Sequence, residues 1–199
     1  MTGVQTCALP IFMIICKGAK TFEETLKMGT EIFHALAKIL KNHDYPTTVG
    51  DEGGYAPRVR SGNREPLTLL SEAITSAGYT LGSDVVFAMD AASSEFYQDG
   101  RYELKCEGKS LSSEEMIDWL EALVNEFPIV SIEDGLAEDD WSGWQQLRAR
   151  IGDRIQLVGD DLLVTNTKLV QKAIDEHAAN ALLVKPNQIG SLTETIQAV

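Results

Sequence analysis

Five short runs of mainly apolar and β-branched residues recur along this chain, and segments with the apolar spacing of amphipathic helices separate them. Continuous apolar runs of this length are typical of strands in a parallel sheet that is buried on both faces. Strands that alternate with helices predict an α/β fold, either a barrel or an open doubly wound sheet. The predicted strands are residues 47–50, 85–89, 129–132, 155–158 and 181–184.

Helix starts are marked by three Ser/Thr-x-x-Glu motifs, at residues 21–24, 112–115 and 191–194. In such a capping box the hydroxyl and the carboxylate satisfy backbone amides that have no partner in the first helical turn. The apolar spacing predicts one helix that begins near residue 21. It predicts further helices at residues 65–77, 113–127, 141–150, 168–176 and from 192 onward.

Two of these helices have a clear apolar face. The first is expected to bury one stripe, which consists of Phe22, Leu26, Gly29 and Phe33, with Ile32, Leu36 and Leu40 beside them. The helix at 113–127 is expected to bury Met116, Trp119, Leu120 and Leu123.

The charge and the cysteine content narrow the class of protein. The chain of 199 residues has a formal net charge of -13, which argues against nucleic acid or an acidic membrane as a partner. Three cysteines without a CxxC pair suggest neither a disulfide framework nor a zinc site, and favour a reducing, cytoplasmic location. The apolar run at residues 8–16 has no Lys or Arg before it and is too short to span a bilayer, so secretion is not expected.

Each predicted strand stops at an ionisable residue. Because the carboxyl ends of parallel strands meet at one face of an α/β fold, these side chains are expected to lie close together. The residues, in chain order, are Asp51 and Glu52, Asp90, Glu133 and Asp134, Asp160 and Asp161, and Lys185.

A cluster of carboxylates repels itself unless a cation lies among its members. Oxygen ligands without His or Cys suit a hard ion such as magnesium, and we predict Asp90, Glu133 and Asp160 as its three ligands. A single acid after a strand is more often a helix cap or a solvated loop residue. Asp51, Asp134 and Asp161 fit two roles equally well. Each is either a helix cap or solvated loop residue, or a residue that supports the site, for example by orienting Lys185.

Lys185 and Glu52 are the remaining candidates for chemistry. Beside a divalent cation the ammonium form of Lys185 is disfavoured, so its pKa is expected to fall toward the range in which a lysine acts as a base. Glu52 precedes two glycines in the sequence VGDEGGY, which allows a sharp turn close to a ligand, although a plain turn is equally consistent with the sequence.

Five ordered segments together resemble the enolase family. They are VGDEGGYAP from Val49, FAMDAASSEFY from Phe87, PIVSIEDGLAEDDW from Pro128, VGDDLLVTN from Val158 and LLVKPNQIGSLTET from Leu182. The resemblance runs from residue 12 to residue 199, and it implies a partial TIM-type (β/α) barrel, truncated at both ends.

The resemblance also implies roles for single residues. Asp90, Glu133 and Asp160 are similar to the family's magnesium ligands, Lys185 to its general base and Glu52 to its general acid. A lysine base with magnesium ions is the established pattern of the enolase superfamily. The resemblance to enolase itself implies the dehydration of 2-phosphoglycerate to phosphoenolpyruvate. Lys185 would remove the proton from carbon 2, and Glu52 would protonate the departing hydroxyl group.

The chain departs from the family at its start. Where the family has a Gln-Glu pair whose glutamate assists the acid step, this sequence has Pro10 and Ile11, so we expect the isolated chain to be inactive in the overall reaction. Residues 1–11 do not match the family, and we hypothesise that they are translated sequencing-adapter read-through. Family members are commonly homodimers. The alternatives left open are a non-catalytic fragment or binding module, and another metal-dependent enzyme of the superfamily.

Overall fold

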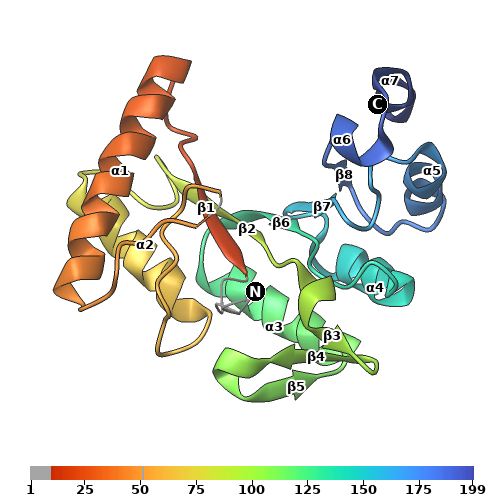
Figure 1. The fold of residues 1–199 in the computed structure, drawn as a ribbon, viewed down its shortest axis with the longest axis horizontal. Helices are drawn as coiled ribbons and strands as arrows, with labels where there is room; N and C mark the ends of the chain where they lie inside the picture. The colour runs from red at the N-terminus through yellow and green to blue at the C-terminus, as the bar shows by residue number, and fades with distance from the viewer. Residues whose placement is uncertain (1–9, 51) are drawn as a thin grey trace, which may run out of the picture. The chain divides into compact units, whose positions relative to one another are not determined.

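The computed structural model describes residues 10–50 and 52–199 (Figure 1). The chain divides into two compact units, Met1–Ala88 and Met89–Val199. Within the described residues, no helix is long and apolar enough to cross a membrane.

The first unit is built on two helices that pack together. Its elements are β1 (Ile11–Ile15), α1 (Phe22–Asn42), α2 (Arg64–Ser76) and most of β2 (Val86–Asp90), which neighbours β1. The Thr21 hydroxyl accepts a hydrogen bond from Glu24 N (3.2 Å), so the predicted cap of α1 is confirmed. Leu40 of α1 and Leu69 of α2 are buried in one cluster with Tyr45.

The predicted apolar stripe of α1 is only partly correct. Ile32 and Leu40 are buried, but Phe22 is 82% exposed and Leu26 is 60% exposed. Met28, which lies outside the predicted stripe, is buried instead. The spacing identified an amphipathic helix, but the contact with α2 selects a face that is rotated away from the start of the stripe.

Residues 47–50 do not form the predicted strand. Val49 makes one isolated antiparallel bridge to Tyr55, and Gly53 N donates to Gly50 O (3.0 Å). Gly53 has a φ of +84°, a conformation that glycine adopts without a steric penalty. The two glycines therefore close a tight turn here, and the apolar run before it ends in that turn instead of entering a sheet.

The second unit contains the parallel sheet predicted from the sequence. Its regular elements after β2 are a 3-10 turn η1 (Ser93–Phe96), β3 (Tyr97–Gln98), β4 (Arg101–Leu104), η2 (Lys105–Glu107), β5 (Lys109–Leu111), α3 (Ser113–Glu126), β6 (Ile129–Glu133), α4 (Trp141–Ile151), β7 (Gln156–Gly159), α5 (Thr167–Asp175), β8 (Ala181–Leu182), α6 (Pro186–Ile189) and α7 (Leu192–Ala198). Helix α4 lies in the segment between β6 and β7, and α5 lies in the segment between β7 and β8 (Figure 1).

Strands β6, β7 and β8 pair in parallel, with Ile132 opposite Leu157 and Val158 opposite Ala181. This register brings the carboxyl ends of the three strands to the same edge. The order of strand, helix and parallel strand is that of an α/β barrel domain, present here as an open segment and not as a closed barrel.

A small antiparallel sheet, β3–β4–β5, was not predicted from the sequence. Tyr102 on β4 is fully buried and anchors this sheet, because its hydroxyl donates to Asp140 Oδ2 (2.8 Å) and accepts from Ala137 N (3.0 Å). Burial, together with the Asp140 carboxylate, raises the pKa of Tyr102. The side chain therefore stays a neutral donor that ties the small sheet to the loop after β6.

The core of the second unit lies between its helices and the parallel strands. The face of α3 predicted from the sequence is confirmed, since Met116, Trp119, Leu120 and Leu123 are all buried. Trp144 on α4 is fully buried and donates its indole N–H to Ala137 O (3.1 Å). This packing holds the β6–α4 loop, which carries part of the site described next.

Candidate metal centre

Two loops at the carboxyl ends of β2 and β6 are joined by hydrogen bonds. Ala91 N donates to Glu133 O (2.9 Å), and Ser93 Oγ donates to Gly135 O (2.9 Å). Asp90 closes its own turn by accepting from Ala92 N (2.9 Å). These bonds place the Asp90 carboxylate beside the Glu133 carboxylate.

The acids form two overlapping groups. Asp90, Glu133 and Asp134 each offer an oxygen within 4.8 Å of the others, and so do Asp134, Asp160 and Asp161. Both groups consist of carboxylates alone, and Asp134 belongs to each. The sequence had placed these acids at strand ends, and the structure brings Asp90, Glu133 and Asp160 into one connected cluster through Asp134.

Asp134 is buried, with 4% of its surface exposed, and it holds the backbone of the next strand end. Its carboxylate accepts from Asp160 N (3.1 Å) and from Asp161 N (2.9 Å). Its φ of +42° is unusual for a residue with a side chain, and the two hydrogen bonds offset the strain. Asp134 therefore holds the backbone at Asp160 and Asp161, whereas the supporting role expected from the sequence was to orient Lys185.

The charges in the cluster act on Glu133. Burial, followed by the charges of Asp90 and Asp160, raises its pKa to about 7. Burial also raises the pKa of Asp134 to about 6, against the lowering effect of its two backbone hydrogen bonds. Without a cation the cluster therefore holds a proton near neutral pH, which is the behaviour expected of carboxylates that share too little positive charge.

Lys185 lies just before α6, three residues after β8, which ends at Leu182 and is shorter than the predicted strand 181–184, and its side chain reaches the same cluster. Its Nζ donates to Asp160 Oδ2, and its backbone N donates to the buried Thr165 hydroxyl (2.8 Å). The hydrogen bond to Asp160 raises the pKa of Lys185, so in the metal-free chain the shift is opposite to the one predicted beside a cation. The reason is that, without a cation, the Lys185 ammonium is the positive partner of the Asp160 carboxylate, which stabilises the protonated lysine.

Gln188 was missed by the sequence reasoning. Its Nε2 donates to Asp160 Oδ1 (2.8 Å), so Lys185 and Gln188 together engage both oxygens of one carboxylate. The two residues are three positions apart, and the short helix α6 that begins after Lys185 brings them to the same side. The only signal in the sequence was this spacing.

Glu52 lies on an exposed turn of the first unit, outside the group of residues whose mutual positions are described above. Asp51 lies outside the described residues. The roles expected for both therefore stay predictions.

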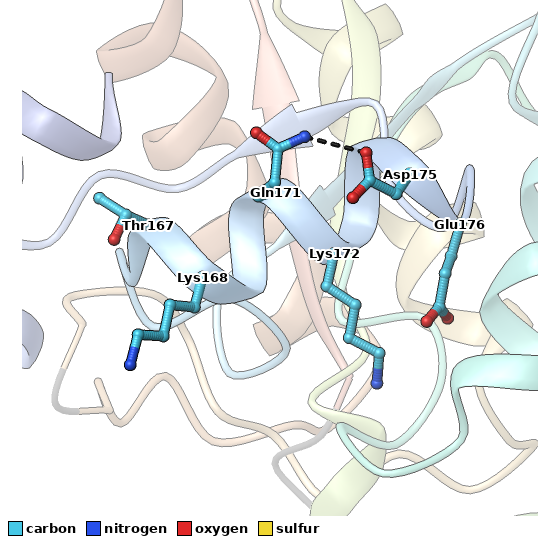
Figure 2. Close-up of a pocket in the computed structure, with 6 residues that line it drawn as sticks. All are labelled: Thr167, Lys168, Gln171, Lys172, Asp175 and Glu176. Atoms are coloured by element: carbon cyan, nitrogen blue, oxygen red, sulfur yellow. Dashed lines mark hydrogen bonds between the residues drawn. The ribbon is translucent and has the colours of Figure 1, made fainter.

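A hollow of about 440 Å³ lies along one face of α5 (Figure 2). Its lining comes from a single helix, and Figure 2 shows Gln171 donating to Asp175 on that surface (2.9 Å). This is the ordinary surface of an amphipathic helix. The hollow contains none of the clustered acids, so the cluster remains the candidate site.

The cluster fits a hard divalent cation. It offers carboxylate oxygens from at least two strand ends, and such oxygens are the ligands that magnesium prefers. Burial and the charges of Asp90 and Asp160 raise the pKa of Glu133, so a nearby cation would stabilise its ionised form. The structure groups Asp90 and Glu133 with Asp134, and Asp160 with Asp134 and Asp161, so the ligand set of Asp90, Glu133 and Asp160 stays a prediction.

The raised pKa of Glu133 predicts how the stability of the metal-free chain depends on pH. Between its ordinary value of 4.5 and about 7, the folded chain keeps a proton that the unfolded chain has released. The free energy of unfolding should therefore fall as pH rises through this window, and the Asp134 shift acts in the same direction. Urea unfolding in a chelator, from about pH 4 to about pH 8, measures this slope.

Glu133→Gln removes the titrating group and should flatten the slope, leaving the part due to Asp134. Saturating magnesium should flatten it as well, because the ion keeps the carboxylates ionised. A wild-type chain whose stability in chelator rises with pH over this window would contradict the assignment.

The geometry agrees with a comparison to known families. A family model described as the enolase C-terminal TIM barrel domain matches residues 3–199, a range that starts before residue 12, where the resemblance was expected to start. The match covers the parallel strands, their connecting helices and every residue of the acidic cluster.

Proposed function

Because this chain belongs to the enolase C-terminal TIM barrel family, we propose that its site serves the magnesium-dependent dehydration of 2-phosphoglycerate to phosphoenolpyruvate, in glycolysis and in the cytoplasm. Family membership makes a function of the enolase superfamily the starting point. The observation that supports the specific reaction is the contact between Lys185 and Asp160 within a cluster of carboxylates. A base beside a cation site is what proton removal next to a carboxylate requires.

Lys185 would act as the base. Lys185 donates to Asp160 in the metal-free chain, and it would bind its proton less tightly if that carboxylate held a cation instead. The neutral amine then takes the proton from carbon 2, and the electron pair of the broken C–H bond delocalises into the substrate carboxylate. The chemistry that bound magnesium supplies is neutralisation of the charge developing on that carboxylate.

Glu52 would complete the reaction. As the double bond between carbons 2 and 3 forms, the carbon–oxygen bond at carbon 3 breaks, and a proton from Glu52 lets the hydroxyl group leave as water. The substrate carries phosphate and carboxylate charges, so in a chain of net charge -13 it depends on local positive charge from Lys185 and the cation.

The first half of the reaction gives the sharper test. Exchange of the carbon-2 hydrogen of 2-phosphoglycerate with solvent deuterium needs the base and the cation but no acid step, and proton NMR follows it. With magnesium, the chain should exchange this hydrogen, and Lys185→Ala should reduce the rate by about 100-fold or more, within the range for loss of a general base. Phosphoenolpyruvate formation, followed by ultraviolet absorbance, should remain absent, because Ile11 stands where the family has its assisting glutamate.

Lys168→Ala is the matched control, since Lys168 is an exposed lysine on α5 and does not belong to the cluster. Its exchange rate should equal that of the wild type. Equal exchange by the Lys185 and Lys168 variants would exclude Lys185 as the base. Magnesium binding without any exchange would favour a non-catalytic binding module.

A further inference from the structure

Gln188 makes a contact that the proposed reaction does not use. Its Nε2 donates to Asp160 Oδ1 at 2.8 Å, while Lys185 Nζ donates to the other oxygen, Oδ2. Asp160 has 5% of its surface exposed, so water has little access to compete for either bond. In the metal-free chain the orientation of this carboxylate is thus set by two donors from one short segment.

The two donors differ in what happens when a cation arrives. The ammonium of Lys185 and a metal ion are both positive, so a cation held by the Asp160 carboxylate would compete with the ammonium for it. The amide of Gln188 is neutral and has no such conflict with the ion. It can therefore stay on Oδ1 and keep the carboxylate plane fixed while Oδ2 changes partner.

The oxygen of the Gln188 amide has no hydrogen-bond partner among the described residues. A carboxylate offers no proton to accept, so Nε2 must face Asp160 and Oε1 must face away. Oε1 is buried, and within the described part of the chain no donor is hydrogen-bonded to it. A buried acceptor without a partner is costly unless a donor arrives with the ligand, and magnesium in proteins usually keeps several of its waters.

We propose that Gln188 is a positioning residue of the metal centre: its Nε2 fixes the Asp160 carboxylate, and its Oε1 accepts a hydrogen bond from a water carried by the bound divalent cation. This inference rests on the proposed function, because it takes the acidic cluster to be the cation site. It adds a neutral residue that touches a metal ligand and acts through it. Mutation of partners of this kind typically costs about 10-fold to 100-fold in metal affinity or activity.

The test compares Gln188→Met with a matched glutamine. Methionine keeps the length of the side chain but neither donates nor accepts a comparable hydrogen bond. Gln171→Met is the control, because Gln171 also donates to an aspartate, Asp175, but on the exposed surface of α5 (Figure 2). Isothermal titration with magnesium chloride alone gives the affinity of each variant, and urea unfolding in a chelator reports on the fold.

The dissociation constant for magnesium should rise by about 10-fold to 100-fold in Gln188→Met and stay unchanged in Gln171→Met. The unfolding midpoint of Gln188→Met in chelator should stay close to that of the wild type. Gln188→Ala, which removes the contact without adding bulk, should show the same loss of affinity.

Three results would overturn the inference, and they are distinguishable. If the wild type binds magnesium and Gln188→Met binds it equally well, Gln188 does not position the site. If both Gln188 variants lose cooperative unfolding, the residue serves the fold. If the wild type itself binds no magnesium, the proposed function fails and this inference fails with it.

Discussion

Replacing Asp160 with asparagine should weaken magnesium binding by about 100-fold or more, because a direct ligand should cost at least as much as the outer partners of a site. Asp160 is nearly buried, and its carboxylate lies among Asp134, Lys185 and Gln188. Asparagine keeps the shape and one oxygen, but it removes one of the negative charges that attract the ion. Isothermal titration with magnesium measures the change directly.

The matched control is Asp153→Asn. Asp153 belongs to the same unit and pairs with Arg148 (2.9 Å), but its side chain is exposed and it is not part of the acidic cluster. Removing the same charge there should leave the affinity within about two-fold of the wild type, because charges exposed to solvent are screened by salt. If Asp160→Asn and Asp153→Asn lost affinity for magnesium equally, binding would depend on the net charge of the chain and not on a specific site at Asp160.

Trp144→Ala should lower the free energy of unfolding of the second unit by about 3–5 kcal/mol, the range for removal of a large aromatic side chain from a core. Trp144 is fully buried, and its indole N–H satisfies the carbonyl of Ala137 in the β6–α4 loop. The variant therefore creates a cavity and also leaves a buried acceptor without its donor. Urea unfolding followed by circular dichroism measures the change.

Trp141→Ala, three residues earlier on the same helix, is the control. Trp141 is only half-buried and contacts the Lys172 ammonium over its ring (3.6 Å to the centroid). Loss of that exposed contact should cost about 1 kcal/mol. A Trp144 variant that is no less stable than the Trp141 variant would mean that the α4 core does not hold the site loop.

The strands and helices of the second unit could largely be predicted from the sequence, because the spacing of apolar residues there agrees with the residues that are buried in the fold. The runs at 129–132 and 155–158 are strands, and the predicted face of α3 is its buried face. Residues 47–50 are Thr-Thr-Val-Gly, with a single Val, and they end in the turn closed by Gly53. A short β-branched run cannot distinguish a strand from the flank of a turn when the deciding contacts lie outside the run.

The candidate site was predictable at the level of residue type and not of geometry. Parallel strands bring acids at their ends together, so the sequence could place Asp90, Glu133 and Asp160 in one region of the fold. The structure groups the first two with Asp134, and Asp160 with Asp134 and Asp161. The hydrogen bonds that Asp134 accepts depend on a positive φ, which sequence spacing does not reveal. Gln188 became visible only once α6 placed its amide on Asp160.

We expect the acids at the strand ends to form a cation site. Titration of the wild-type chain with magnesium at about pH 8, where Glu133 is ionised, measures whether they do. We predict saturable binding that raises the temperature of unfolding and is lost in Glu133→Gln, because the ion binds the folded cluster and not the unfolded chain. Absence of saturable binding, or equal binding by Glu133→Gln, would contradict the claim.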